Sequence, residues 1–298
     1  MLKIGILSFA KKSNKEIKDL IEKQPLCKLL GTATCNKLQV VDDSVKSIIT
    51  VDELVDLSDI IVLDSASSEN MDVIFDLIKK YKHLYFINTG KFTHQHTSDI
   101  LKLIDEAGVH CMFSQPHRMN PLINYAFEHI NSISFINITE NGYHNETDNL
   151  IYNKLLEKID ILLMFMRSNI YRISACSSSD EFINIRLEFN SAINANITIN
   201  QLAETNCSTI EILSPGENVK IDLLRNELYK INKTRKCKLV KEEENLKDID
   251  SIVLLEKEFY TFVNQIFIGE DLDYDIQDYL LANAIADDVL KKISYVLT

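Results

Sequence analysis

The sequence lacks three features that would place it in a special class of protein. Its six dispersed cysteines form no C-x-x-C pair, which argues against a disulfide framework and fits reduced thiols in a cytoplasm. Its longest apolar run, Ile161 to Met166, is far shorter than the roughly 20 residues that a membrane helix needs. The start of the chain has too short an apolar core for a secretion signal. We therefore expect a cytoplasmic protein without a membrane partner.

Basic residues are also scarce. The 298 residues include 32 Lys and Arg against 44 Asp and Glu, which gives a net charge of −12. Because phosphate neutralisation needs clustered Lys and Arg, this balance argues against a nucleic-acid partner. A hydrophobic content of 46% with 26% charged residues is typical of a soluble globular chain, and the length suffices for two domains.

Residues 1–120 alternate strand and helix signals, which predicts an α/β domain with a Rossmann-like parallel sheet. Asp59–Asp64 is a continuous apolar run, typical of a strand buried on both faces. Gly108 closes a helix predicted over Ser98–Ala107. The other strands are predicted at Ile4–Ser8, Lys28–Thr34, His83–Asn88 and Val109–Ser114, and the other helices at Lys15–Lys23, Val51–Asp56 and Met71–Tyr81.

After Pro121 the pattern changes to that of an α+β domain over residues 121–298. A long apolar helix is predicted over Asn149–Met166, and runs of two-residue periodicity predict a largely antiparallel open sheet. The strands are expected at Ser132–Glu140, Tyr171–Cys176, Glu181–Phe189, Ala192–Asn200, Ser208–Leu213, Asn218–Leu224 and Tyr229–Val240. Helices over Ile252–Phe267 and Ile276–Ile293 follow, and the last one is expected to return to the first domain.

The turn after the first strand lacks the glycines of a dinucleotide-binding turn. In G-x-G-x-x-G the first glycine permits a tight turn, the second lets the pyrophosphate approach the backbone, and the third lets the helix pack closely. Ser8, Ala10 and Ser13 occupy these positions. Ala10 puts a Cβ where the diphosphate would lie, and Ser8 would strain a turn with positive φ. NAD(P) binding is therefore expected to be weak or absent.

The order of the elements resembles the glucose–fructose oxidoreductase/inositol dehydrogenase (Gfo/Idh/MocA) family over nearly the full chain. Lys3-Ile-Gly-Ile-Leu is similar to the family's opening strand, and Asp59-Ile-Ile-Val-Leu-Asp-Ser-Ala to its third strand. Arg118-Met-Asn-Pro121 resembles the family's domain boundary, and Asp160 the aspartate that ends its Asp-x-x-x-His-x-x-Asp helix motif. The resemblance implies the fold of a two-domain NAD(P)-dependent oxidoreductase.

The resemblance also implies which residues occupy the family's functional positions, and most of these are substituted. The lysine beside the reacting carbon falls on Thr89, and the histidine of the helix motif falls on Glu157. A threonine cannot exchange a proton near neutral pH, whereas a suitably buried glutamate can act as a base. The remaining family positions are Ser8, Ala10, Ser13, Thr34, Lys37, Ser65 and Asn88 for the cofactor, and Asn153 and Arg118 for the substrate.

The end of the second predicted strand bears on the choice of cofactor. Thr34 stands where the family has an acidic residue that holds a ribose hydroxyl, and the loss of that acid disfavours NAD. Lys37 suits a 2′-phosphate, so any surviving preference is for NADP.

Two other groups have structural interpretations. His94-Gln-His96 has no third ligand at a defined spacing, so we expect loop histidines and no metal site. Arg118 suits an acidic substrate, and an interdomain ion pair explains it equally well.

Two classes of function stay open. In the first, the chain is Gfo/Idh/MocA-like, has weak or lost dehydrogenase activity, and binds a small ligand or a partner. In the second, it is a working NAD(P)-dependent oxidoreductase that acts on a sugar-like or other small polar substrate. The altered positions favour the first class, and the fold analogy favours the second.

We also expect a homo-oligomer, most simply a dimer through the exposed face of the C-terminal sheet. The two-residue periodicity leaves one sheet face uncovered by the long helix, and an open apolar face of that size is too large to leave in water. The residues expected there, or their neighbours in another register, are Ile183, Ile185, Leu187, Ile193, Ile197 and Ile199.

Overall fold

The computed structural model of the chain describes residues 1–10, 15–34, 50–130, 132–142, 149–166, 168–179, 181–232, 235–238, 249–272 and 276–296. The chain divides into two compact units, each built from two segments. Unit 1 comprises Met1–Gln115 and Leu255–Leu281, and unit 2 comprises Pro116–Leu254 and Ala282–Thr298. The segment that returns to unit 1 is thus Leu255–Leu281, whereas most of the last helix belongs to unit 2.

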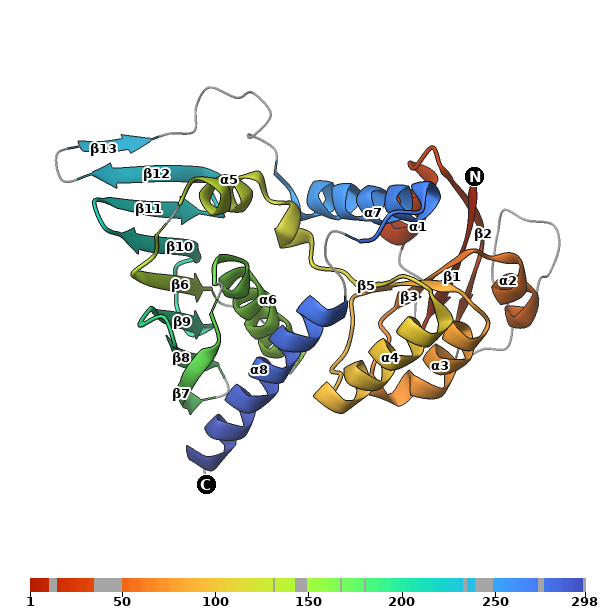
Figure 1. Ribbon diagram of the computed structural model, residues 1–298, viewed down its shortest axis with the longest axis horizontal. Helices are drawn as coiled ribbons and strands as arrows, with labels where there is room; N and C mark the ends of the chain where they lie inside the picture. Colours follow the sequence, from red (N-terminus) through yellow and green to blue (C-terminus); the bar gives the residue numbers. More distant parts are fainter. Residues whose placement is uncertain are drawn as a thin grey trace. The chain divides into compact units, whose positions relative to one another are not determined.

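Unit 1 is a three-layer α/β fold (Figure 1), in which α1 and α7 lie on one face of a parallel sheet and α3 and α4 on the other. The five strands have the order β2-β1-β3-β4-β5, which confirms the predicted Rossmann-like sheet. The strands are β1 Leu2–Ser8, β2 Cys27–Thr34, β3 Ile60–Asp64, β4 His83–Ile87 and β5 Cys111–Phe113. The helices are α1 Lys15–Glu22, α2 Val51–Leu57, η1 Ser68–Asn70, α3 Met71–Lys79, α4 His94–Ala107, α7 Ser251–Ile268 and, shared with unit 2, α8 Ile276–Val296.

The amino-acid composition of the central strands explains how they pack. All five residues of β3 are buried, as a continuous apolar run between two helical layers requires. Gly5 in β1 allows close packing, because a Cβ there would come within 2.7 Å of the Ser58 Oγ. This close approach brings α2, which Ser58 ends, against the first strand.

The helix α4 begins earlier than the sequence predicts. Thr93 is its N-cap, and the Thr93 Oγ1 accepts a hydrogen bond from the His96 N–H at 3.2 Å. His94 and His96 therefore lie in the first helical turn and are not loop histidines. Gly108 ends the helix with φ +64°, as predicted. Within the described residues, no group of three or more His, Cys, Asp or Glu is arranged to hold a metal ion.

A buried carboxylate ties α7 to the sheet of unit 1. Glu258 is fully buried, and it accepts hydrogen bonds from the Tyr85 hydroxyl, the Ser114 hydroxyl and the Gln115 N–H, each at 2.6 Å. The ring of Phe259 packs edge-on against Tyr85 at 5.0 Å. Burial and then the charge of Glu258 raise the pKa of Tyr85 well above its usual value. The returning segment therefore completes the core of unit 1.

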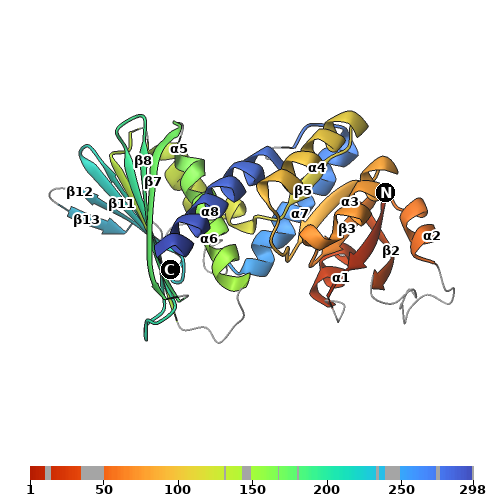
Figure 2. The ribbon, with the colours of Figure 1, turned by 90° about the horizontal axis from the view of Figure 1, so that it is seen from below.

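Unit 2 contains an eight-stranded sheet with α5 and α6 on one face (Figure 2). The strand order is β13-β12-β11-β10-β6-β9-β8-β7, and among the described pairs only β6–β9 is parallel, which confirms the predicted largely antiparallel sheet. The strands are β6 Phe135–Asn141, β7 Ile170–Ser179, β8 Phe182–Phe189, β9 Asn194–Asn200, β10 Cys207–Ser214, β11 Glu217–Asp222, β12 Glu227–Asn232 and β13 Arg235–Lys238. The helices are η2 Pro116–Met119, α5 Pro121–His129 and α6 Asn149–Phe165.

Two elements of unit 2 differ from the prediction. The helix α5 was not predicted, although Asn120 caps it by accepting from the Leu122 N–H at 2.9 Å and Pro121 occupies its first turn. The single strand predicted over Tyr229–Val240 is instead the antiparallel pair β12 and β13.

The register of the second sheet overturns the predicted outward face. Ile183, Ile185, Leu187, Ile197 and Ile199 are all at most 4% exposed. Because α6 packs against β9, this burial assigns them to the face that α6 covers. Side chains alternate along a strand, so their neighbours point to the opposite face. The predicted apolar outer face is therefore wrong. Ile193 precedes β9 and is half-buried.

The open face of this sheet is polar. Asn184 and Thr198 are register partners, and the Asn184 Nδ2 donates to the Thr198 Oγ1 at 2.9 Å. On neighbouring strands, the Asn196 Nδ2 donates to the Asn137 Oδ1 at 3.2 Å. Among the residues that the structure describes, no helix lies on this face (Figure 2). The same face carries the ion pairs Arg186–Glu188 at 3.4 Å and Lys220–Glu211 at 2.6 Å. Amides, hydroxyls and paired charges therefore occupy the surface on which isoleucines or their neighbours were expected.

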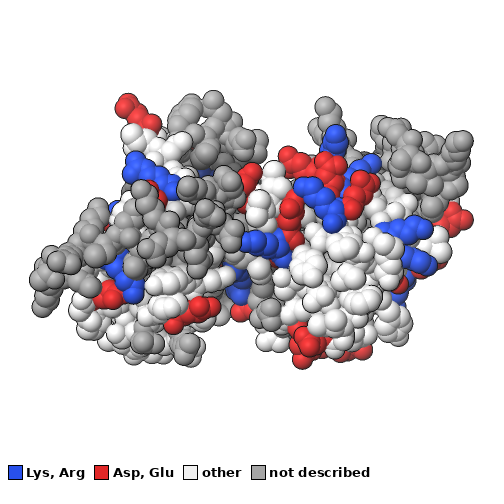
Figure 3. Space-filling view, turned by 90° about the horizontal axis from the view of Figure 1, so that it is seen from above, with Lys and Arg blue, Asp and Glu red and all other residues white. Residues whose placement is uncertain are grey.

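Charges of both signs are mixed on the surface. On the face in Figure 3, the coloured Lys and Arg residues lie among Asp and Glu and form no continuous basic patch. Ion pairs such as Lys23–Glu256 at 2.5 Å and Lys80–Asp56 at 3.0 Å are part of this mixture. None of the helices in the described ranges combines the length and the hydropathy needed to cross a bilayer.

Candidate functional site

The carboxyl ends of β1, β3 and β4 form one edge of the parallel sheet, where open α/β folds bind their ligands. Ser8 and Asp64 are register partners at this edge. Asp64 is 2% exposed, and its Oδ2 accepts from the Ser8 hydroxyl at 2.8 Å. Its Oδ1 accepts from the Ser65 hydroxyl and from the Asn88 Nδ2, each at 3.1 Å. We call Ser8, Asp64, Ser65 and Asn88 the edge cluster.

The edge cluster brings together three of the predicted cofactor positions, Ser8, Ser65 and Asn88. Their partner Asp64 was not among the predicted residues. It ends an otherwise apolar strand and directly precedes Ser65, so an acid at the carboxyl end of a buried strand was the available signal.

The backbone N–H groups of the turn after β1 form hydrogen bonds within the protein. The Ala10 N–H donates to the Ser8 Oγ at 3.3 Å, and the Phe9 N–H donates to the Asp64 carbonyl at 2.9 Å. Ser8 is not among the described non-glycine residues with positive φ, so the strain predicted for it is absent. Ser13 lies outside the described residues.

Two members of the edge cluster have strained backbones. Ser65 and Asn88 adopt φ values of 59° and 51°, in the left-handed region that residues other than glycine rarely occupy. Such conformations concentrate at binding sites because the surrounding structure must enforce them. Thr89 follows and is half-buried, and a Cβ on Gly90 would come within 2.8 Å of the Ser67 Cβ. The backbone path through Thr89, the residue predicted to replace the family's lysine, is therefore narrowly fixed.

Thr34, which was predicted to stand in place of a ribose-binding acid, lies at the same edge. Thr34 ends β2 and is the register partner of Ser8 on β1. It is half-buried. Lys37, which was predicted to favour a 2′-phosphate, lies outside the described residues.

In unit 2, Asp160 holds the predicted substrate residue Arg118. Asp160 is 1% exposed and accepts from the Arg118 Nε at 2.8 Å and the Nη2 at 2.6 Å. The His117 Nε2 lies 2.6 Å from the same carboxylate. Burial alone would raise the pKa of Asp160, but the hydrogen bonds from Arg118 and His117 outweigh it and lower the pKa to about 2. Arg118 is thus paired within its own unit.

Glu157, at the position of the family's histidine, is also ion-paired. Its Oε1 accepts from the Lys158 Nζ at 2.8 Å, and Lys158, only 4% exposed, also lies 3.1 Å from Glu140. Burial raises the pKa of Glu157, but the charges of Lys158 and His117 outweigh it and hold the pKa below its usual value. A carboxylate held in this way is a weak base.

The remaining predicted residue, Asn153, lies one helical turn before Glu157 on α6 and is exposed. Lys158 was missed, because its partner Glu140 lies on β6 and helical periodicity alone does not reveal such a contact. The roles assigned to Asn153, Glu157 and Arg118 stay predictions.

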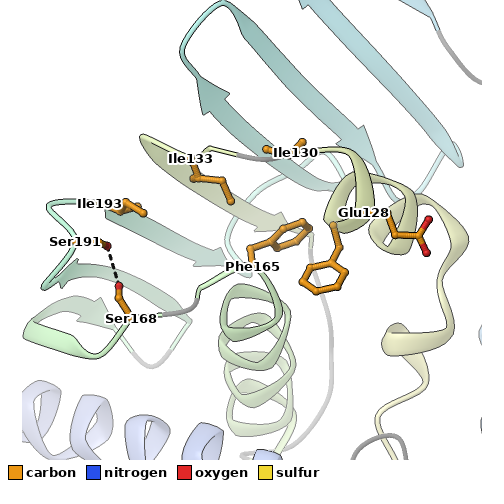
Figure 4. Close-up of a pocket in the computed structure, with 8 residues that line it drawn as sticks. Glu128, Ile130, Ile133, Phe165, Ser168, Ser191 and Ile193 are labelled. Atoms are coloured by element: carbon orange, nitrogen blue, oxygen red, sulfur yellow. Dashed lines mark hydrogen bonds between the residues drawn. The ribbon is translucent and has the colours of Figure 1, made fainter.

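A separate pocket of about 410 Å³ lies between the ends of α5 and α6 and the starts of β6 and β9 (Figure 4). The Ser168 and Ser191 hydroxyls bond to each other at 2.8 Å beside it. None of the predicted site residues lines the pocket, which is formed by Phe127, Glu128, Ile130, Ile133, Phe165, Ser168, Ser191 and Ile193.

Solved structures of dehydrogenases and oxidoreductases share the fold of this chain over nearly its full length. UDP-N-acetylglucosamine 3-dehydrogenase from Acidithiobacillus ferrooxidans matches with a TM-score of 0.82 at 12% identity, over 100% of this chain and 99% of that one. A dehydrogenase from Clostridium difficile matches with a TM-score of 0.80 at 16% identity, over 98% and 99% of the two chains. Biliverdin reductase from Synechocystis sp. PCC 6803, in complex with biliverdin and NADP+, gives 0.75 at 10% identity over 99% of both.

These matches concern structure alone. No protein-family model matches the sequence, and no curated protein matches it. The fold class predicted from the sequence is confirmed, and the neighbours are oxidoreductases of the kind that the Gfo/Idh/MocA resemblance implies.

The pairing of Asp160 predicts a large stability effect. Asp160→Asn should lower the free energy of unfolding by about 3 kcal/mol, because it removes the charge of a carboxylate that is 1% exposed and that Arg118 pairs with at 2.6 Å. Asp99→Asn is the control, since the Lys102–Asp99 pair is exposed and contributes less than about 1 kcal/mol. Urea unfolding at pH 7 measures both, and equal losses for the two variants would contradict the assignment.

The same pair predicts a pH dependence. The pKa of Asp160 is lower in the folded chain, about 2, than its ordinary value of 3.8, so the folded state binds fewer protons in this range. The stability from this group is fully present above pH 3.8 and is lost as the pH falls through about 2. The difference between wild type and Asp160→Asn should shrink over that window.

Proposed function

We propose that this chain is a Gfo/Idh/MocA-like protein that has weak or lost dehydrogenase activity and binds a small ligand or a partner. The proposal rests on the two residues predicted at the family's proton-transfer positions, Thr89 and Glu157. Thr89 has no group that exchanges protons near neutral pH, and Glu157 is paired with Lys158 at 2.8 Å. Its lowered pKa leaves it a poor proton acceptor.

The cofactor proposal follows from the edge cluster and its neighbours. Weak or absent NAD(P) binding is supported by the Cβ of Ala10 and by Thr34 in place of an acidic residue. Lys37 supports a preference for NADP over NAD in any binding that remains. The dispersed cysteines, which form no C-x-x-C pair, support a cytoplasmic location.

A second function is favoured by one observation. The fold matches a UDP-N-acetylglucosamine 3-dehydrogenase over the whole chain. A working NAD(P)-dependent oxidoreductase acting on a sugar-like or other small polar substrate is therefore the alternative, by analogy of fold.

Turnover measurements decide between the two functions. Wild-type protein should show no NAD(P)-dependent oxidation of sugars or polyols above background, since losing one positioned proton-transfer group costs about 10²–10⁴-fold in rate. Thr89→Lys/Glu157→His restores both family groups and should raise the rate if a cofactor binds. Robust wild-type turnover that Glu157→Gln abolishes would refute our proposal and make Glu157 the general base.

Nucleotide titration tests the cofactor proposal. NADPH should bind with a dissociation constant well above the micromolar range, and NADH more weakly still, as followed by nicotinamide fluorescence. Ser8→Gly/Ala10→Gly should strengthen binding because it removes the Cβ from the diphosphate position. Micromolar binding of either nucleotide to the wild type would show that the steric argument is wrong.

We further propose that a second copy of the chain covers the open face of the unit 2 sheet, as the resembled family implies. The half-buried, uncharged side chains Asn137, Asn184 and Thr198 of this face support this, because their desolvation is cheaper than that of charged groups. Because the isoleucines of this sheet are buried within the chain, the proposal does not rest on apolar burial.

Sedimentation tests the dimer. The wild type should sediment at twice the chain mass of 34.2 kDa, and Asn196→Arg should yield monomers by placing like charges across the two-fold interface. Asn190→Arg, in the exposed turn between β8 and β9, is the matched control and should leave the dimer intact. A wild-type monomer at micromolar concentration would rule the interface out.

A further inference from the structure

The hydrogen-bond donors of the edge cluster are directed to its own carboxylate, Asp64. In an open α/β fold, the groups at the carboxyl ends of the strands face the ligand. Here the Ser8 hydroxyl, the Ser65 hydroxyl and the Asn88 amide all donate to the carboxylate of Asp64. Three donors that converge on one acid form an anion site whose anion is part of the chain.

The backbone of the turn is engaged in the same way. A dinucleotide-binding turn offers backbone N–H groups to the pyrophosphate. The Ala10 N–H is directed instead to the Ser8 Oγ at 3.3 Å, and Ser8 in turn donates to Asp64 at 2.8 Å. The donor nearest to the second glycine position is therefore already satisfied.

In the part of the chain that the structure describes, the side chains that donate hydrogen bonds to the Asp64 carboxylate are all neutral. No Lys, Arg or His of the described ranges forms an ion pair with it. Asp64 is 2% exposed, so its charge is poorly screened by solvent. A diphosphate brought to this edge would meet a negative charge at close range.

We propose that Asp64 is the residue that excludes a dinucleotide from this edge, because its carboxylate takes the place of the phosphate anion. The edge then accepts ligands that carry no anionic group there, such as a neutral polyhydroxylated molecule. This inference rests on the weak dinucleotide binding proposed above and assigns that weakness to charge as well as to the Cβ of Ala10.

The test is Asp64→Asn, which keeps the shape of the side chain and removes its charge. Its matched control is Asp59→Asn, which makes the same change just before the amino end of β3, where Asp59 accepts from the Lys3 N–H at 2.8 Å. Asp64→Asn should strengthen NADPH binding on the order of 10-fold to 100-fold, as expected for removing a like charge in a partly desolvated site. Asp59→Asn should leave the binding unchanged.

Combining Asp64→Asn with the glycine variant separates the effect of the carboxylate charge from the steric effect of the two Cβ atoms. Ser8→Gly/Ala10→Gly removes both Cβ atoms but leaves the carboxylate, so its gain should be smaller than that of the triple variant with Asp64→Asn. If Asp64→Asn has the wild-type melting temperature and circular dichroism yet binds NADPH no better than Asp59→Asn, the inference is overturned. Micromolar binding by the wild type overturns the weak-binding proposal instead, and the ratio between the two Asn variants still tests Asp64.

A second measurement needs no variant at position 64. Reduced nicotinamide riboside carries no charge, and its 5′-phosphate differs by the anion alone. The wild type should bind the phosphate no more tightly than the riboside, because the repulsion cancels the hydrogen bonds that a phosphate ordinarily gains. Tighter binding of the phosphate would overturn the inference even if Asp64→Asn failed to fold.

Discussion

A carboxylate removed from water must receive hydrogen-bond donors or a cation, and this constraint shapes both units. Glu258 receives three donors from the sheet and so fixes α7 to unit 1. Asp160 receives Arg118 and His117 and so fixes η2 to α6 in unit 2. Asp64 receives the polar side chains at the carboxyl edge. In each case the acid determines where neighbouring polar groups point.

At the edge cluster, hydrogen bonds to the buried acid compete with hydrogen bonds to a ligand. A hydroxyl or amide that satisfies a buried acid cannot donate the same hydrogen to a ligand, and removing the acid's partner would leave the charge unpaired. Ser8 and Asn88 therefore direct to Asp64 hydrogen atoms that they could otherwise donate to a ligand.

Sequence patterns predicted the elements well where one physical requirement dominates. The apolar run of β3 and the long apolar helix α6 appear at nearly the expected residues. The helix α5 was missed because Asn120-Pro121 was interpreted as a domain boundary, although an N-cap followed by proline also begins helices. Two-residue periodicity separated the faces of the second sheet, but it did not show which face the helix α6 covers, and the isoleucines lie on the covered one.

The candidate site was predictable only in part, because partners across strands are not encoded in local spacing. Ser8, Ser65 and Asn88 could be selected from their places at strand ends, whereas Asp64 gains its importance from parallel neighbours far away in the sequence. The helix motif shows the same limit. Asp160 keeps an aspartate with its Arg118 partner, while Glu157 three residues earlier is bound to Lys158. Local spacing therefore located both acids of this helix, but their different partners, Arg118 for Asp160 and Lys158 for Glu157, became known only from the structure.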